Sequence, residues 1–404
     1  MMTVKKNLTL PVCFGSFIIL SMIPQIMGFN GTIFDDIYKL GLVGILFLIT
    51  TPLRDCRKVS VFSGLFFGVG VINTLGIIIT NNANVYKEGM NLLISIFLLY
   101  IFVESVSKKF NLRYEDILKF YKIYAYFMLI ASVYNMLVHF DSLLHITSLN
   151  VYNTDEICSF FDNKNTYGVF LIFGVLASII LKVSTGKKKW LAFSGVFFIN
   201  ELMAMCRTAI ILSIAMIIIS FLVDNKSRIK NIVLFLFFAY LCVMIVRSNS
   251  TVNSFIFNNL FGNSNSVDAR NEYVEKLLPF ARGIHFYFGY GSDGAMELAS
   301  NYTENAYYHN TYLKALMSGG IVKVGLQISA ILFSLSYGNK CRRIDKKIGN
   351  LCILSTLIYV VYAFVESVVL FDTPVVAIMA VVFIISMPIM FYNMFLNETY
   401  NAEV

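Results

Sequence analysis

The chain has 404 residues, of which 57% are hydrophobic and only 14% are charged, and its mean hydropathy is +0.71. This composition excludes an ordinary water-soluble globular fold, whose surface needs many more charged residues. The formal net charge of +8 is divided among short basic groups between apolar stretches, which is typical of anchoring at a membrane and argues against nucleic-acid binding. The sequence therefore predicts an all-α polytopic membrane protein.

The apolar stretches occupy nearly the whole sequence. A hydrocarbon core about 30 Å thick is crossed by roughly 20 mostly apolar residues in a helix, and the chain contains about twelve such stretches. We therefore expect a single membrane domain over residues 1–404. The seven cysteines have no short paired spacing and indicate neither a disulfide framework nor a metal site. The predicted spans are 10–28, 38–52, 59–79, 90–107, 118–140, 166–183, 189–205, 207–223, 231–247, 311–337, 348–370 and 375–394, most of them uninterrupted.

Basic residues concentrate in alternate loops, and this bias orients the predicted spans. It places both chain ends in the cytoplasm, because loops rich in lysine and arginine stay on that side. Two of the intervening outer loops, 141–165 and 248–310, are too long to be simple connections. In the larger one, the apolar residues of "DARNEYVEKLLPF" (268–280) have helical spacing. We expect a short amphipathic helix there, on the membrane surface.

A few cationic residues lie on the predicted outer side, against the general bias. Arginine presents a planar fork of donors that suits phosphate or carboxylate, so Arg207 and Arg270 suggest an anionic ligand such as a lipid-linked diphosphate. Convergence of these charges is a hypothesis, because ionisable groups near hydrocarbon need a partner or a wet cavity. The other outer candidates are Lys164 beside Asn165, Arg282, and His309.

His309 and Asn310 begin the segment "YYHNTYLKALMSGGIVKVG" (307–325). An imidazole accepts a proton from a hydroxyl as a general base, and Asn310 would orient that ring or bind a sugar hydroxyl. A structural alternative is that Asn310 or Thr311 caps the following helix and His309 is an interfacial side chain. The glycines at 319 and 320 favour close helix packing.

The other candidates have structural alternatives too. Arg207 would be an interfacial arginine or a partner of Glu201. Arg270 would be a solvated residue of the surface helix, and Lys164 an ordinary loop charge. The segment "YFGYGSDG" (287–294) is a glycine-rich turn that lacks the lysine and the strand of a phosphate loop.

The order of these motifs resembles the O-antigen polymerase and O-antigen ligase family. Three motifs carry the resemblance, over about 160–325. They are "FDNKNTYG" before a mid-chain span, Arg-Thr-Ala at the start of a later span, and an outer loop with Arg, then Gly-Tyr-Gly, then His-Asn. It implies that Arg207 and Arg270 contact the donor diphosphate and that His309 is the base. Cys206 replaces a small residue found in many members. The resemblance also implies that Asn165, Gly289, Gly291 and Asn310 shape the pocket, and Arg282 is a spare candidate for the second phosphate contact. The whole substrate-binding set that we expect comprises Lys164, Asn165, Tyr273, Arg282, Gly289, Tyr290, Gly291 and Asn310.

This family resemblance implies a glycosyltransferase of the bacterial cytoplasmic membrane with an extracytoplasmic active site. Its donor would be an oligosaccharide on undecaprenyl diphosphate, transferred with inversion and without a cofactor or metal, and its partners would be membrane lipid, a chain-length regulator and a flippase. We favour a polymerase, because polymerases are the more numerous and divergent class. The alternatives are a ligase that transfers finished glycan and, from another class, a polysaccharide transporter or flippase.

Overall fold

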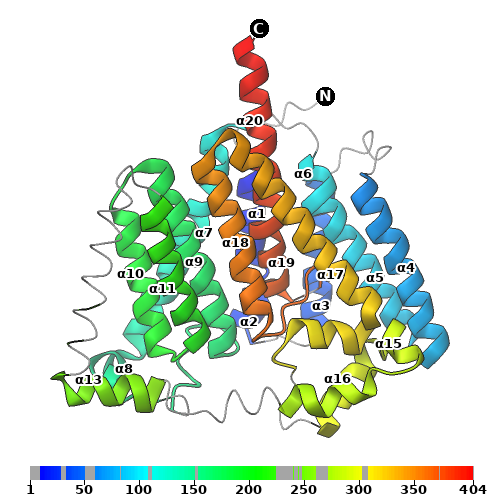
Figure 1. Ribbon diagram of the computed structural model, residues 1–404, viewed down its shortest axis with the longest axis horizontal. Helices are drawn as coiled ribbons and strands as arrows, with labels where there is room; N and C mark the ends of the chain where they lie inside the picture. The colour runs from blue at the N-terminus through cyan, green and yellow to red at the C-terminus, as the bar shows by residue number, and fades with distance from the viewer. Residues whose placement is uncertain are drawn as a thin grey trace. The chain divides into compact units, whose positions relative to one another are not determined.

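The structure is a computed structural model (Figure 1), and it describes residues 10–28, 33–50, 60–81, 83–107, 112–150, 153–223, 240, 244, 248–260, 272–302, 308–372 and 374–403. Within these ranges every regular element is helical, which confirms the all-α prediction for them. The chain packs as two compact units. The first unit contains the described residues among Met1–Met22, Gly31–Ile117 and Ser266–Val404, and the second contains those among Ile23–Asn30 and Leu118–Asn265. The expectation of a single membrane domain stays a prediction.

The described helices include seven that are long and apolar enough to cross a membrane, and shorter apolar helices at Leu10–Ile26, Ile37–Thr50 and Arg207–Ser220. The total of about twelve spans stays a prediction, since the stretch at 231–247 lies almost wholly outside the described residues. The seven long helices are Val61–Asn81, Val85–Ser107, Tyr114–Val138, Lys164–Thr185, Thr311–Ile344, Lys346–Ala363 and Val375–Asn397.

The first unit is a helical bundle with a deeply buried C-terminal helix. In the apolar window of Val375–Asn397, 83% of the residues are buried, against 22% in Val61–Asn81. The first of these helices is therefore central, whereas the second presents apolar side chains to the bilayer. The unit's elements are α1 (Leu10–Leu20), α3 (Ile33–Thr50), α4 (Val61–Asn81), α5 (Val85–Leu99), η1 (Tyr100–Glu104), α6 (Ser105–Ser107), residues 272–277, η4 (Leu278–Phe280), α15 (Ile284–Phe288), α16 (Gly291–Tyr302), α17 (Thr311–Ile344), α18 (Lys346–Ala363), α19 (Val375–Val381), η5 (Val382–Ser386) and α20 (Met387–Glu403).

Helix α17 is broken at Gly320, where φ is 66° and ψ is −168°. The turn after α15 packs into the break: Tyr290 N donates to Met317 O at 2.7 Å, and a Cβ added to Gly320 would lie 2.1 Å from Tyr287 O. Figure 1 shows α15 and α16 across the ends of α4 and α17, which they contact. The span predicted at 311–337 is therefore interrupted, whereas most of the spans were expected to be uninterrupted. The close packing expected at the two glycines is present, and the neighbour of Gly320 is the end of the short helix α15.

The break makes Gly320 a sharp test of the fold. Gly320→Ala should destabilise the protein by more than about 3 kcal/mol, because the new methyl group meets backbone atoms at a positive φ. Gly325→Ala in the same helix is the matched control, since nothing lies within 4 Å of its added Cβ; it should be neutral or stabilise by up to about 1 kcal/mol. The measurement compares the melting temperatures of the two variants with that of the unchanged protein in detergent. Equal melting temperatures would contradict the break.

The second unit is organised around a buried polar network. Asn200 Oδ1 accepts hydrogen bonds from Asn135 Nδ2 and from the Tyr167 hydroxyl, each at 3.0 Å, and both asparagines are fully buried. A satisfied buried network fixes the register of the helices that supply it. The unit's elements are α2 (Ile23–Ile26), α7 (Tyr114–Val138), α8 (Phe140–Leu144), η2 (Ile146–Ser148), α9 (Lys164–Thr185), α10 (Lys189–Met203), α11 (Arg207–Val223), α13 (Ser250–Ser254) and η3 (Phe255–Leu260).

The surface helix expected at 268–280 is only partly within the described residues. Residues 272–277 are α-helical and are followed by the 3-10 turn η4, whereas the part that includes Arg270 lies outside the described ranges. Tyr273 and Leu277 of this helix are buried, so at least one of its faces packs inward.

Candidate active site

The start of α17 is fastened to the segment that follows α18. Asn310 caps α17: its Oδ1 accepts from Leu313 N at 2.9 Å, and its Nδ2 donates to Phe364 O at 3.1 Å. The Thr311 hydroxyl donates to Glu366 O at 2.6 Å and accepts from Val368 N at 2.8 Å. The cap interpretation is thus confirmed for Asn310, whereas Thr311 is the first residue of the helix.

His309 directly precedes this cap and faces a carboxylate. Its Nδ1 lies 3.6 Å from Glu366 Oε2, and its ring stacks on Tyr273 with centroids 6.0 Å apart and planes at 13°. The imidazole is 20% exposed and the carboxylate only 5%. His309 has a φ of 46°, a left-handed conformation that is uncommon outside glycine and concentrates at functional sites. A partly accessible imidazole therefore lies beside a buried acid.

The pair is suited to proton transfer. At 3.6 Å His309 Nδ1 and Glu366 Oε2 are not hydrogen-bonded to each other. A closer approach of the carboxylate in the substrate complex would favour the tautomer with hydrogen on Nδ1, leave Nε2 to accept a proton, and stabilise the imidazolium that forms. Glu366 was missed from the sequence, although it is the single charged residue of the apolar segment "AFVESVVL" (363–370). Such an isolated charge at the end of a span is itself a sign of function.

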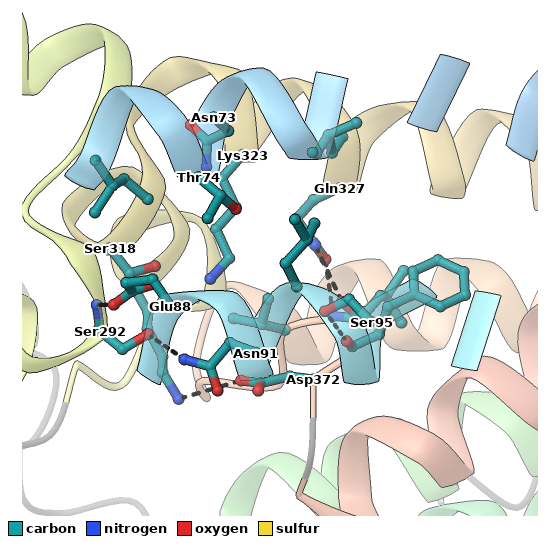
Figure 2. A pocket seen from close by; sticks show the side chains of 18 of the residues that line it. Asn73, Thr74, Glu88, Asn91, Ser95, Ser292, Ser318, Lys323, Gln327 and Asp372 are labelled. Carbon is teal, nitrogen blue, oxygen red and sulfur yellow. Dashed lines mark hydrogen bonds and ion pairs between the residues drawn. The ribbon is translucent and has the colours of Figure 1, made fainter. Parts of the chain in front are cut away.

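A cavity of about 410 Å³ lies beside this pair and entirely within the first unit. Tyr308 and Ser367, the sequence neighbours of His309 and Glu366, both line it. Burial raises the pKa of the Tyr308 hydroxyl, which donates to Ala295 O. Figure 2 shows polar side chains from α4, α5, α16 and α17 around the cavity. Those labelled there are Asn73, Thr74, Glu88, Asn91, Ser95, Ser292, Ser318, Lys323, Gln327 and Asp372.

The cavity wall formed by residues 367–372 is held through main-chain atoms. Gln327 donates to Leu370 O at 3.3 Å and accepts from Leu370 N at 2.8 Å. The Tyr359 hydroxyl donates to Val368 O at 2.7 Å, and the Ser95 hydroxyl donates to Phe371 O at 3.0 Å. Phe371 has a φ of 59°. Such a conformation persists only where neighbouring contacts fix it, so this wall is firmly positioned.

The predicted Gly289–Gly291 turn lies next to the cavity. A Cβ on Gly289 would lie 2.5 Å from Gly319 N, so only glycine allows the backbone to approach the break in α17. A Cβ on Gly291 would lie 3.0 Å from Glu88 Oε1, which accepts from Ser292 N at 2.7 Å. The turn therefore fits the pocket-shaping role expected of it, although that role stays a prediction.

Tyr290 and Arg282 lie close to each other at this turn. The Tyr290 hydroxyl donates to Phe280 O at 2.9 Å, and its ring stacks on His285 with centroids 4.1 Å apart. Burial raises the pKa of Tyr290, and the exposed guanidinium of Arg282 opposes part of that rise. Substrate contacts of these two side chains stay predictions.

The candidates of the second unit come together at the starts of α9 and α11. Lys164 O accepts from Cys206 Sγ at 2.8 Å, directly before Arg207, and Lys164 Nζ pairs with Asp155 Oδ1 at 2.6 Å. The structure thus brings Lys164 and Asn165 of one helix close to Arg207 of another. Glu201, considered as a partner of Arg207, accepts from the Ser213 hydroxyl at 2.6 Å.

Comparison with known proteins bears on this arrangement. Residues 190–326 match a family model described as O-Antigen ligase. No curated protein matches the chain closely enough to establish a relative. The matched range contains Arg207, the Gly289–Gly291 turn and His309, and it ends before Glu366. Together with the apolar helices, this match points to the bacterial inner membrane. It supports the resemblance to the O-antigen polymerase and ligase family, whose members are glycosyltransferase-like enzymes.

Proposed function

We propose that the protein polymerises a bacterial surface polysaccharide. It transfers glycan from undecaprenyl diphosphate to a hydroxyl of an acceptor repeat unit, at the outer face of the cytoplasmic membrane. The observation that supports this most is the pairing of His309 with Glu366 beside a polar cavity, because glycosyl transfer to a hydroxyl needs a base at the acceptor. The family match supports the same class of reaction.

In the proposed step, the acceptor hydroxyl gives its proton to His309 Nε2 while its oxygen attacks the anomeric carbon. The bond between that carbon and the diphosphate oxygen breaks, and its electron pair leaves with the diphosphate. Glu366 stabilises the imidazolium. Attack from the face opposite the leaving group inverts the anomeric centre. Arg207 and Arg270 stabilise the growing charge on the diphosphate, as fixed cations do for oxyanions.

Arg207 provides a prediction about the donor. Arg207→Ala should weaken binding of undecaprenyl diphosphate about tenfold or more, because a hydrogen bond to a charged group contributes roughly 1.5–3 kcal/mol. The matched control is Arg343→Ala, an exposed arginine at the end of α17. Binding is measured on the purified protein in nanodiscs. Unchanged affinity together with unchanged turnover would remove Arg207 from the diphosphate site.

Two other functions each have one observation in their favour. The family description names a ligase, and the break in α17 beside a polar cavity is a feature that transporters share. The gene-deletion phenotype separates them: single repeat units on the normal acceptor indicate a lost polymerase, and full-length glycan left on the carrier indicates a lost ligase. Repeat units confined to the cytoplasmic side indicate a lost flippase.

The direct test supplies purified protein with one defined lipid-linked repeat unit. A polymerase produces a ladder of products on the carrier with no other acceptor present. A ligase does not extend the repeat unit but transfers it to an added foreign acceptor. That result would contradict the polymerase proposal and support the ligase.

A further inference from the structure

Two buried polar atoms on the cavity wall lack a hydrogen-bond partner among the residues that the structure describes. They are Asn73 Oδ1 on α4 and Ser318 Oγ on α17, and their residues are only 6% and 5% exposed. Both residues line the cavity. Buried polar groups are almost always satisfied in folded proteins, and an unsatisfied one calls for a bound molecule or a functional reason. Two on the same wall mark a place where a polar molecule binds.

Lys323 adds a positive charge to the same wall. It follows the break in α17, and its side chain extends into the cavity (Figure 2). No acceptor in the described ranges lies within hydrogen-bonding distance of its Nζ. Lys323 lies beside Asn73, because a Cβ on Gly319 would meet Lys323 Cβ at 2.6 Å and Asn73 Nδ2 at 2.9 Å. An ammonium group, a hydroxyl and an amide oxygen thus line one region of the cavity.

The other charged side chains of the cavity already have partners. Lys87 pairs with Asp293, Lys314 Nζ lies 4.0 Å from Asp372 Oδ2, and Glu88 accepts a backbone hydrogen bond from α16. Among the described residues, the ammonium group of Lys323 and the carboxylate of Glu88 have no ion pair, and the negative charges of Glu88 and Asp372 both act on Lys323. An ammonium group removed from bulk water gains from a close acceptor, so the cavity suits a ligand that brings an anionic group to Lys323.

The uncharged polar groups of the cavity favour a sugar as this ligand. A sugar ring carries hydroxyls that donate to Asn73 Oδ1 and exchange hydrogen bonds with Ser318, whereas a fully ionised phosphate has no donor for the amide oxygen. The cavity volume of about 410 Å³ lies within the range of small-ligand sites, roughly 300–1,000 Å³. Apolar side chains such as Phe67, Leu92 and Phe371 complete the lining.

We infer that the cavity is a binding subsite for an acidic sugar of the glycan. Its anionic group, a carboxylate or a sugar phosphate, pairs with Lys323, and its hydroxyls bond Asn73 and Ser318. This inference rests on the proposed glycan transfer, since it places one residue of the glycan beside His309 and Glu366. The phosphate of an anionic phospholipid has the same charge and is the competing source.

The test measures binding and not turnover. The full-length protein, in nanodiscs of phosphatidylcholine, is titrated with glucuronate, galacturonate and N-acetylneuraminate, and with glucose and galactose as neutral sugars, by saturation-transfer NMR. We expect at least one acidic sugar to bind more tightly than the neutral ones. Lys323→Met should weaken that binding about tenfold or more, and Lys323→Arg should restore part of it. Lys346→Met, at an exposed lysine on α18, should change nothing.

A structural role for Lys323 makes a different prediction about stability. If Lys323 stabilised the fold by pairing with Glu88 or Asp372, Lys323→Met would lower the melting temperature of the ligand-free protein. We expect the melting temperature to stay equal or rise, because the substitution removes a cation without a close partner. A clear fall would overturn the inference.

Further outcomes separate this inference from the proposed function. Equal binding of acidic and neutral sugars, or binding unaffected by Lys323→Met, overturns the acidic-sugar subsite even if His309 proves essential for polymer formation. If phosphatidylglycerol stabilises the protein in a Lys323-dependent way and no acidic sugar does, the cavity binds lipid. That result also overturns the acidic-sugar subsite. His309→Asn should retain sugar binding. If that variant still makes polymer, the proposed base fails while the binding result stands.

Discussion

His309→Asn is expected to abolish polymer formation, lowering turnover by about 10²–10⁴, the contribution typical of a general base. Asparagine tolerates the left-handed backbone at this position, where φ is 46°, and it remains polar. It cannot take a proton from a hydroxyl. The loss of turnover would therefore report the missing base and not a damaged turn. The measurement is the rate of repeat-unit addition by the purified protein in nanodiscs, with folding checked by melting temperature.

His145→Asn is the matched control for this substitution. His145 is an exposed histidine of the second unit, and its ring lies 3.0 Å from Asp141 O. It should retain full activity. Normal polymer length and yield in His309→Asn would show that His309 is not the base. His309 would then be an interfacial side chain without a catalytic role. Asn310 is the helix cap in either case.

Glu366→Gln should lower turnover roughly tenfold to a thousandfold while leaving the KM for the acceptor nearly unchanged. The neutral amide keeps the shape of the side chain but no longer favours one imidazole tautomer or stabilises the imidazolium. The fold should survive, because Thr311 bonds the main-chain oxygen of Glu366 and not its side chain. Glu366→Asp, which keeps the charge, should recover part of the rate.

The pH–rate profile separates positioning from a structural role. If Glu366 acts through His309, its replacement by glutamine changes the acid limb of the profile. If Glu366 only supports the fold, the variant loses folded protein and the remaining enzyme keeps the wild-type profile. Glu297→Gln, at an exposed position on α16, is the control and should behave as wild type. An unchanged rate and profile in Glu366→Gln would exclude it from the proton-transfer pair.

Much of the helical layout could be predicted from hydropathy alone. Spans predicted at 189–205 and 207–223 match α10 (Lys189–Met203) and α11 (Arg207–Val223) within two residues, because polar turns end apolar runs abruptly. The break in α17 was not predictable in this way. It depends on the end of α15, about thirty residues earlier in the sequence, whose backbone atoms reach Gly320. Hydropathy carries no information about such an approach.

The candidate site was only partly predictable for the same reason. His309 stands out in the sequence as an ionisable residue at the start of a span. Glu366 is far from His309 in the sequence, and no local pattern connects the two residues. Lys323 lies inside an apolar helix, where the sequence shows it only as an isolated charge. Only the folded chain shows that Lys323 lines a cavity to which His309 and Glu366 are joined through their lining neighbours Tyr308 and Ser367. Whether Arg207 and Arg270 contribute to the same chemistry stays a prediction.

The way in which residues 366–371 are fastened has a consequence for how the lining of the cavity can vary. Every hydrogen bond described for this segment engages a main-chain atom, of Glu366, Val368, Leu370 or Phe371. Bonds of this kind do not depend on the side chains at those positions. Ser367 and Val369 line the cavity between the fastened positions, so their side chains can change without the loss of these hydrogen bonds. The segment is a replaceable wall: under the proposed sugar binding, new side chains there would select a different sugar while His309 and Glu366 keep their geometry.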